Sequence, residues 1–247
     1  MRILCLAVLL LFYGTAECLA GVLCLTFDDR HFDSWTNALP IFAKYDARAT
    51  FFPCGKLEKA DLEKLGLLSR AGHSVGIHTI SHQNVLPKFD RLLGGWRFYI
   101  RDVFPQILSL RKIYVRPNAF AYPYGDHTAA SDEWLGRRFR FVRGAEMRCY
   151  VTNGVPLAGC DRVFIPIASI KQTTYLPAVA VGEAYKTDIE DLCEGVKRLD
   201  GRDEMLCLFS HDIRKDAKGN GMKTDWLETL LAVAKKHQVA VRGLDEL

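Results

Sequence analysis

The sequence predicts an α/β fold built on a parallel β-sheet. Short apolar stretches rich in β-forming residues alternate along the chain with segments in which apolar residues recur at helical spacing. The first of these stretches, residues 23–27, is apolar at successive positions apart from one threonine, which is typical of a strand buried on both faces. No linker, repeat or low-complexity segment divides the chain, so residues 21–247 are expected to form one domain.

The expected strands lie at residues 23–27, 49–52, 75–77, 119–122, 139–143, 163–167, 205–209 and 239–241. Strands that alternate with helices pair in parallel. The simplest assembly is therefore a barrel-like ring of seven or eight strand–helix units, and an open doubly wound sheet is the alternative. No glycine-rich phosphate-binding loop supports nucleotide binding.

The expected helices lie near residues 34–45, 62–71, 90–110, 134–135, 189–199 and 227–234. In the second of these, Leu62, Leu65 and Leu68 share one face, and Gly72 provides a C-terminal stop. Pro40 is expected to bend the first helix, because proline has no backbone N–H to donate. The segment 144–162 is expected to form a long loop.

The overall composition is that of an ordinary globular protein, with 49% hydrophobic and 25% charged residues. The formal net charge of +4 is small, and no run of lysine and arginine occurs. These features argue against nucleic acid as a partner, because nucleic-acid-binding surfaces concentrate positive charge.

Residues 1–20 have the layout of a secretory signal peptide. Arg2 precedes the apolar run 3–13, and small residues follow, with Ala16 and Ala20 as candidate cleavage sites. The run is too short to span a bilayer, and no later segment is long and apolar enough to do so. We therefore expect an exported protein, periplasmic, in the cell envelope or extracellular; a buried N-terminal strand or helix is the alternative.

Six of the eight cysteines lie after residue 20, where export would permit disulfides. Cys149 and Cys160 flank a loop that contains glycine and proline, and they form the best candidate bridge. Cys24 and Cys207 lie within expected core strands and are read as buried thiols. No two cysteines have the Cys-x-x-Cys spacing, so cysteine-based zinc or redox chemistry is not expected.

Two adjacent carboxylates, Asp28 and Asp29, follow the first strand. Burying such a pair inside a sheet is costly, so the pair is expected where the strand reaches the surface. In parallel α/β folds, ligands bind at the carboxyl ends of the strands. A solvated loop with Asp29 capping the next helix is the alternative for this short motif taken alone.

His78 and His82 follow the expected strand 75–77 and are four residues apart. A helical turn at the strand exit would point both rings the same way, so that they could share a metal ion. Asp29 could supply a third ligand, since both segments leave parallel strands at the same edge. Asp28 would then stand beside the metal site as a base.

These stretches resemble motifs of the polysaccharide deacetylase (NodB homology) family, carbohydrate esterase family 4. The resemblance begins with the segments 26–29 and 78–82 and extends over about residues 22–247. The segment 121–125 (Ala-Tyr-Pro-Tyr-Gly) is similar to the third motif, and 208–212 (Leu-Phe-Ser-His-Asp) is similar to the last. This resemblance implies a distorted, incomplete (β/α)7 barrel related to the TIM barrel, and an enzyme that carries out metal-dependent deacetylation.

Roles follow from the resemblance residue by residue. Asp28 matches the catalytic base and His211 the general acid, while the backbone N–H of Tyr124 matches the oxyanion donor. The metal ligands are matched by Asp29, His78 and His82. The expected cofactor is a divalent cation, Zn²⁺ with Co²⁺ or Ni²⁺ as alternatives.

Two departures from the family pattern bear on the site. The arginine that often opens the third motif and pairs with the base is replaced by Ala121. The fourth motif is not recognisable in residues 150–180, so the group that orients His211 is open between Asp212, Asp161 and a loop residue.

The function expected is removal of acetyl groups from N-acetylated sugars of a polysaccharide or oligosaccharide. Tyr122 and Tyr124 are expected to contact the substrate, because tyrosine rings stack on sugars. One alternative is an amide hydrolase acting on a small cyclic amide or a formamide. Another is a catalytically inactive carbohydrate-binding protein.

Overall fold

The computed structural model describes residues 21–89, 94–146 and 155–247. The expected signal peptide, residues 1–20, lies outside this part of the chain, as does Cys149 of the expected disulfide. Within the described residues, no helix is long and apolar enough to cross a membrane.

The central element is β1 (Val22–Asp29), which pairs in parallel with β2 (Thr50–Pro53) on one side and β9 (Glu204–Ser210) on the other. Among the described residues, the principal sheet has seven strands, five of which follow the order β3 (Ser74–Val75), β2, β1, β9 and β6 (Phe164–Pro166). Two further strands pair with its centre, β12 (Ala240–Val241) with β1 and β8 (Val179–Ala180) with β9. The expectation of a mainly parallel sheet is confirmed.

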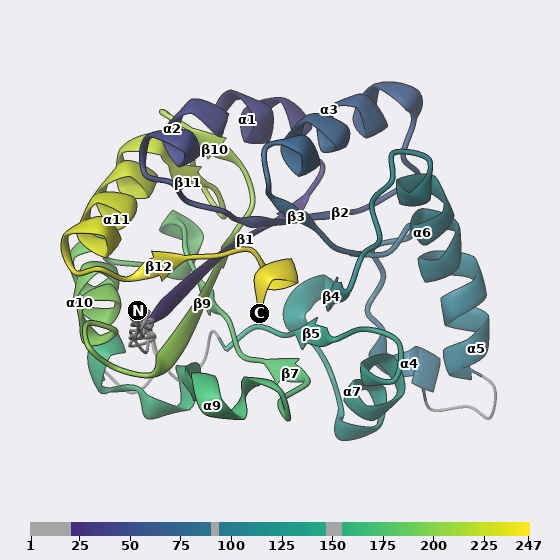
Figure 1. Ribbon diagram of the computed structural model, residues 1–247. Helices are drawn as coiled ribbons and strands as arrows, with labels where there is room; N and C mark the ends of the chain where they lie inside the picture. Colours follow the sequence, from purple (N-terminus) through teal and green to yellow (C-terminus); the bar gives the residue numbers. More distant parts are fainter. Residues whose placement is uncertain (1–20, 90–93, 147–154) are drawn as a thin grey trace, which may run out of the picture.

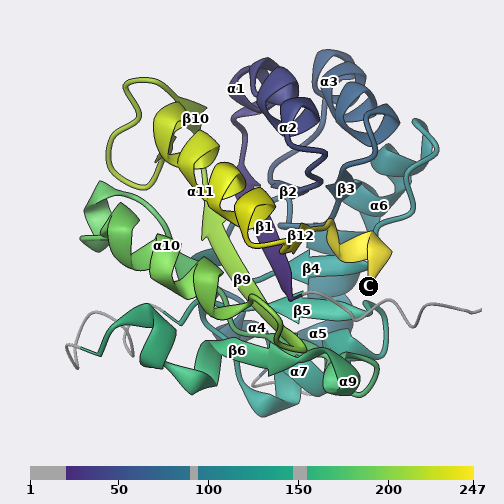
Figure 2. The same cartoon turned by 60° about the vertical axis from the view of Figure 1, so that its left-hand side comes forward.

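A second parallel sheet continues the curve of the first. It consists of β4 (Ala119–Ala121), β5 (Phe141–Arg143) and β7 (Tyr175–Leu176). An isolated bridge between Ile77 and Phe120 connects it to the end of β3 (Ser74–Val75). The pairings among described residues do not close the ring, so the strands form an incomplete barrel surrounded by helices (Figures 1 and 2).

One strand runs against the rest. β6 (Phe164–Pro166), expected as another parallel strand, is antiparallel to the first half of β9. Apolar periodicity cannot reveal this direction, because a buried strand has the same pattern in both orientations. A short pair, β10 (Ile213–Arg214) with β11 (Met222–Lys223), lies beyond the end of β9.

The helices are α1 (Phe32–Asn37), α2 (Leu39–Lys44), α3 (Lys59–Arg70), α4 (Leu86–Phe89), α5 (Gly94–Phe98), α6 (Phe104–Arg111), α7 (Ala129–Gly136), α9 (Ile167–Ile170), α10 (Ile189–Arg198) and α11 (Thr224–Lys236). The helix expected at 34–45 is divided at Ala38, and Pro40 stands in the first turn of α2, where a missing N–H is harmless. The helix expected at 90–110 is described from Gly94, and a π-helical turn, Tyr99–Val103, interrupts it.

Alternate side chains of β1 point into two different layers of the hydrophobic core. Leu23, Leu25 and Phe27 belong to the layer beneath the outer helices. Cys24 belongs to the layer inside the barrel, with Cys207 beside it on β9; both are buried, as expected. Because side chains alternate along a strand, Asp28 continues the inward row of Cys24 and ends it at the carboxyl edge.

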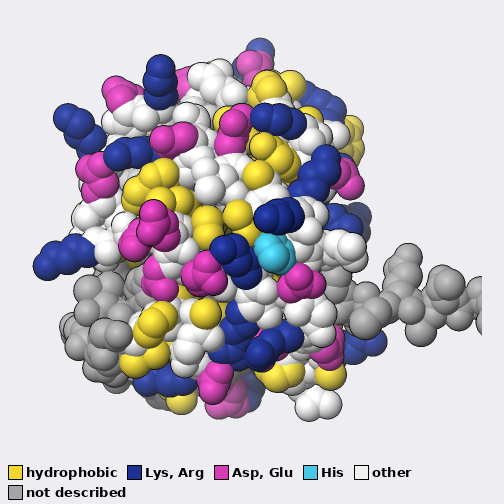
Figure 3. Space-filling model, turned by 90° about the vertical axis from the view of Figure 1, so that its left-hand side faces the viewer, with side chains coloured by type: hydrophobic (Ala, Val, Ile, Leu, Met, Phe, Trp, Pro, Cys, Tyr) yellow, Lys and Arg dark blue, Asp and Glu magenta, His cyan; other side chains and the backbone are white. Residues whose placement is uncertain are grey.

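The face formed by α10 and α11 is an ordinary protein surface. It carries lysine and arginine side chains interspersed with aspartate and glutamate, and hydrophobic side chains are scattered between them (Figure 3). Mixed charge of this kind favours solubility rather than binding to a polyanion.

Candidate active site

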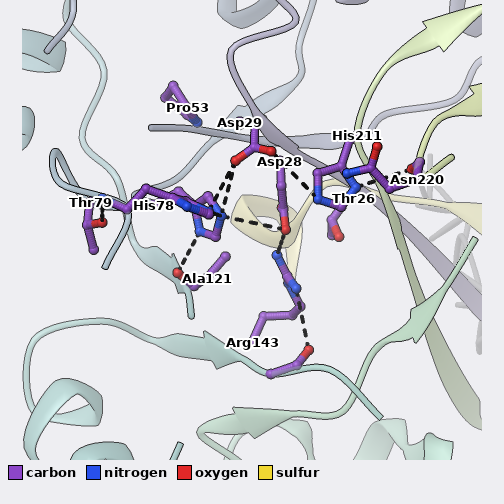
Figure 4. Close-up of polar contacts among 12 residues, drawn as sticks. Thr26, Asp28, Asp29, Pro53, His78, Thr79, Ala121, Arg143, His211 and Asn220 are labelled. Carbon is purple, nitrogen blue, oxygen red and sulfur yellow. Dashed lines mark hydrogen bonds and ion pairs between the residues drawn. The ribbon is translucent and has the colours of Figure 1, made fainter. Parts of the chain in front are cut away.

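The sequence-predicted site residues meet at the carboxyl ends of the parallel strands. They line a cavity of about 460 Å³ together with apolar and aromatic side chains. The residues that line it are Asp28, Asp29, His78, His82, Tyr122, Tyr124, Gly125, Arg143, Ala145, Tyr185, Phe209, His211 and Asn220. β1 supplies the two carboxylates, and the loop after β3 supplies His78 and His82. His211 follows directly after β9, and Figure 4 shows it on the other side of the aspartates from His78.

Asp29, His78 and His82 form a compact trio. The Nε2 atoms of the two histidines are 3.2 Å apart, and Asp29 Oδ1 lies 3.7 Å from His78 Nε2 and 3.3 Å from His82 Nε2. One potential ligand atom from each residue lies within 4.8 Å of the others. Zinc ligands in a tetrahedral array are separated by about 3.4 Å, since each lies about 2.1 Å from the metal. The trio therefore fits a small divalent cation.

The hydrogen bonds of the trio support the same conclusion. His78 Nδ1 lies 2.9 Å from the carbonyl oxygen of Ala121, which accepts a hydrogen bond from Nδ1–H and leaves the lone pair of Nε2 facing the trio. Asp29 Oδ1 is buried and has no hydrogen-bond partner among the described residues. A buried carboxylate oxygen without a partner is costly, and a cation would satisfy it.

The backbone is strained at the trio. Asp29, Thr79 and His82 have φ values of 83°, 68° and 47°, in the left-handed region that non-glycine residues seldom occupy. At Asp29 this conformation has a clear use. Adjacent residues of a regular strand point to opposite faces, whereas here Asp28 and Asp29 both approach His78, at 3.9 Å and 3.7 Å.

Asp28 is buried and forms an ion pair with Arg143, whose Nη2 donates to Asp28 Oδ2. Burial alone would raise the pKa of Asp28, but the charges of Arg143, His78 and His211 outweigh it and lower the pKa. The other oxygen, Oδ1, has no hydrogen-bond partner among the described residues. Asp28 is thus held ionised with one oxygen uncommitted.

Arg143 is the functional residue that sequence reasoning missed. Ala121 stands where the resemblance to the family would place the arginine that pairs with Asp28. Arg143 occupies the position directly opposite Ala121 on the neighbouring strand β5. The sequence signal that could have identified it is an arginine at the end of an apolar strand. In the structure, Arg143 is 1% exposed. Its guanidinium also lies 4.7 Å from the ring centre of Phe209.

His211 is oriented by the backbone. Its Nδ1 lies 3.2 Å from the carbonyl oxygen of Asn220, which leaves Nε2 directed to the cavity, 3.8 Å from Asp29 Oδ2. The two carboxylates considered for this task are engaged elsewhere. Asp161 pairs with Arg198 at 2.7 Å, and Asp212 pairs with Arg214 at 2.5 Å.

The two tyrosines differ in what they can offer. Tyr124 is 63% exposed, and its ring lies 4.8 Å from that of His82. Tyr122 lines the cavity but is 1% exposed, and its hydroxyl donates to Asp132 at 2.7 Å. Gly125 follows Tyr124 and closes the turn by donating its N–H to the carbonyl oxygen of Tyr122. Its φ is 74°, and a Cβ at this position would lie 2.3 Å from the Cβ of Ala145. Tyr124 therefore has an open ring face, and Tyr122 contributes to the wall.

The sequence model of the polysaccharide deacetylase family matches residues 19–137. The match includes the two carboxylates, both histidines of the trio and the turn at Tyr124, and it ends before Arg143. Over these residues, just under half of the chain, the sequence is that of a polysaccharide deacetylase domain. The enzyme class expected for it, hydrolases of carbon–nitrogen bonds, is the class of that family. No curated protein matched the sequence.

Solved structures of deacetylases and esterases share its fold. The chitin deacetylase of Colletotrichum lindemuthianum aligns over 91% of this chain and 86% of its own, with a TM-score of 0.60 and 17% identity. A family 4 acetyl xylan esterase from Clostridium thermocellum, in complex with a cobalt ion, aligns over 91% of this chain and 89% of its own, with a TM-score of 0.58 and 15% identity. The peptidoglycan deacetylase PdaC of Bacillus subtilis aligns over 93% of this chain and 91% of its own, with a TM-score of 0.54 and 17% identity. These alignments confirm the NodB-like incomplete barrel as the fold of this chain.

Proposed function

We propose that this protein is a metal-dependent hydrolase that removes acetyl groups from the N-acetylated sugars of a polysaccharide. One observation carries the proposal: a metal-ligand trio, an ionised buried aspartate and an oriented histidine converge on one cavity. The proteins of similar structure described above include deacetylases of chitin and of peptidoglycan and an acetyl xylan esterase, which act on acetylated glycans.

Asp29, His78 and His82 would hold the cation through Oδ1 and the two Nε2 atoms. When bound, a divalent metal polarises a carbonyl group and makes water more acidic. Nitrogen and oxygen ligands in this combination suit Zn²⁺, and Co²⁺ or Ni²⁺ are compatible with the same set.

The residues around the trio divide the proton transfers. Asp28 accepts a proton from the attacking water, because its pairing with Arg143 keeps the carboxylate ionised next to the site. His211 donates a proton to the departing amine from Nε2, since Asn220 holds its Nδ1. The backbone N–H of Tyr124 stabilises the negative charge that develops on the carbonyl oxygen.

The cavity also offers a surface for the sugar. Tyr124 presents an exposed ring at its rim, and Phe209 with Tyr185 supplies apolar wall. A volume of about 460 Å³ accommodates a sugar unit with its acetyl group rather than a folded protein segment.

Metal analysis combined with an acetate-release assay tests the proposal. The purified protein should contain about one equivalent of divalent metal, and it should release acetate from one or more of chitin oligomers, acetylated xylan and peptidoglycan. Removal of the metal with a chelator should abolish release, and adding Zn²⁺ or Co²⁺ back should restore it. Full activity in metal-free protein would refute the proposal.

We also propose that the protein is exported with residues 1–20 removed. The support is the charged, apolar and small-residue layout of that segment. Sequencing the N-terminus of protein recovered from the envelope or medium should find a start between Glu17 and Gly21. An intact Met1 on the exported protein would contradict cleavage.

A further inference from the structure

Gln106 of α6 is a buried polar residue with a central place behind the metal-ligand trio. Its side chain is 1% exposed, although it lies on a helix whose outer face is open to solvent. A buried amide is costly unless its donors and acceptor are all engaged. Here they engage the backbone of two segments far from each other in the sequence.

The amide joins the loop that carries the histidines to the strand beside the aspartates. Gln106 Oε1 accepts the backbone N–H of His78 at 3.2 Å. Gln106 Nε2 donates to the carbonyl oxygen of Pro53 at 2.9 Å and lies 3.3 Å from that of Gly55. Pro53 is the register partner of Asp29 across the β1–β2 pair. One side chain therefore contacts the backbone of one ligand and the strand partner of another (Figure 4 shows Pro53, Asp29 and His78).

The π-helical turn before α6 binds the backbone of the next residues of the histidine loop. The carbonyl oxygen of Asp102 accepts the N–H of Ile80, and its carboxylate accepts the N–H of Ser81, both at 3.0 Å. Asp102 lies in the π-helical turn that precedes α6, and such turns are frequent at functional sites. The inner side of Tyr99–Arg111 is thus a template for residues 78–81.

The loop needs such a template because its backbone is strained. Thr79 and His82 both have positive φ, and Thr79 is β-branched, which makes this conformation costly. Strained conformations persist where the surroundings fix them with several contacts. Without the amide of Gln106, the peptide of His78 would lose its acceptor at the point where the chain enters this conformation.

We propose that Gln106 is a positioning residue that sets the affinity of the Asp29–His78–His82 trio for its metal. This inference rests on the proposed metal-dependent function. Groups that orient metal ligands typically change metal affinity by about 10- to 100-fold when they are removed. Gln106 acts through the main chain of the ligand loop rather than through an imidazole nitrogen.

Metal affinity in Gln106→Leu, measured by competition with a chelating dye, tests the inference. Leucine has a similar volume and cannot hydrogen-bond, so the dissociation constant for Zn²⁺ should rise about 10- to 100-fold. The absorption spectrum of the Co²⁺-loaded variant should also change, because it reports the geometry of the ligands. Ile107→Val is the matched control, since it removes one methyl group from the buried core on the same helix and no hydrogen-bonding group; it should lower thermal stability and leave affinity and spectrum unchanged.

Gln106→Glu is the second variant, and it preserves side-chain shape if the leucine variant does not fold. It keeps an oxygen for His78 N–H but places the other oxygen against the carbonyls of Pro53 and Gly55, so affinity should fall here too. Wild-type affinity and spectrum in either folded variant would overturn the role of Gln106 while leaving the proposed function intact. A wild-type protein that binds no metal would instead refute the proposed function and this inference with it.

Discussion

Arg143 pairs with Asp28 from the strand position directly opposite Ala121, so the ion pair of the site is formed across strands rather than along the third motif. Both partners are buried, at 1% and 3% exposure. An arginine is well suited to this position, because its planar guanidinium stays charged and can engage a carboxylate with fixed geometry.

Arg143→Ala should lose most acetate release. Without its partner, the pKa of the buried Asp28 carboxyl rises, so Asp28 is a less available base, and loss of a general base costs about 10² to 10⁴ in rate. Stability should fall by about 3–5 kcal/mol, because a buried charge is left without compensation. Turnover and chemical denaturation measure the two effects, with Arg140→Ala as a control that removes a guanidinium bonded to the backbone carbonyls of Ile170 and Thr173.

The double variant Arg143→Ala/Ala121→Arg tests the cross-strand relationship directly. It returns the arginine to the motif position, one strand away at the same register, and should recover part of the lost turnover. Recovery no greater than in Arg143→Ala alone would show that the two positions are not interchangeable.

Substitutions of the two adjacent aspartates should have different effects on metal binding. Asp28→Asn should retain the cation and lose turnover by about 10² to 10⁴, because an amide cannot accept the proton of water. Asp29→Ala should lose the cation, because it removes one of three ligands. Metal content measured on both purified variants decides between the roles, and an empty site in Asp28→Asn would assign that residue to the ligands instead.

His211→Ala should keep both fold and metal but lose turnover by about 10² to 10⁴, because the departing amine has no proton donor. The loss should be smaller on acetyl esters with good leaving groups, which depart without protonation. Comparing rates on an N-acetyl glycan and on an activated acetyl ester checks this. An equal loss on both substrates would point to a role in binding or in holding Asp29 instead.

His73 should make stability depend on pH. Burial and the nearby charge of Arg48 lower its pKa from the ordinary 6.5 to about 4, and its Nδ1 accepts the backbone N–H of Ala49 at 3.0 Å. Between these two values the unfolded chain binds more protons, so stability rises with pH through this window and is fully present above it. The contribution of His73 should shrink by about 2 kcal/mol from pH 7 to pH 5.

Denaturation of His73→Gln at both pH values checks this expectation. The variant should be less stable at pH 7 but should lose about 2 kcal/mol less than the wild type on moving to pH 5. Val75→Ala, which removes buried apolar volume two residues away and no titratable group, is the control and should retain the wild-type dependence. An unchanged dependence in His73→Gln would place the acid sensitivity elsewhere.

Most of the site could be predicted because it depends on strand ends. The residues that follow apolar strands in a parallel sheet meet at one edge, so Asp29 and His78 could be placed together from strand order, whereas His211 was assigned from the resemblance to the family. Strand positions were well predicted for the same reason, since burial on both faces leaves an uninterrupted apolar signal.

What could not be predicted depends on lateral register and on backbone groups. The pairing of Arg143 with Asp28 requires knowing which residue of β5 stands opposite Ala121, and a single sequence does not contain that alignment. The partner of His211 is the carbonyl oxygen of Asn220, which carries no side-chain signature. The antiparallel direction of β6 was missed because burial periodicity is blind to strand polarity.

The positive φ of Asp29 has a consequence for transplanting such a centre into another scaffold. Copying the two consecutive aspartates onto the end of a parallel strand would leave their carboxylates on opposite faces of the pleat. The recipient backbone must also turn left-handed at the second position, which aspartate and asparagine tolerate better than most residues do. A designer would therefore choose recipient strands by the dihedral angles just beyond their last ladder bond, before considering any side chain.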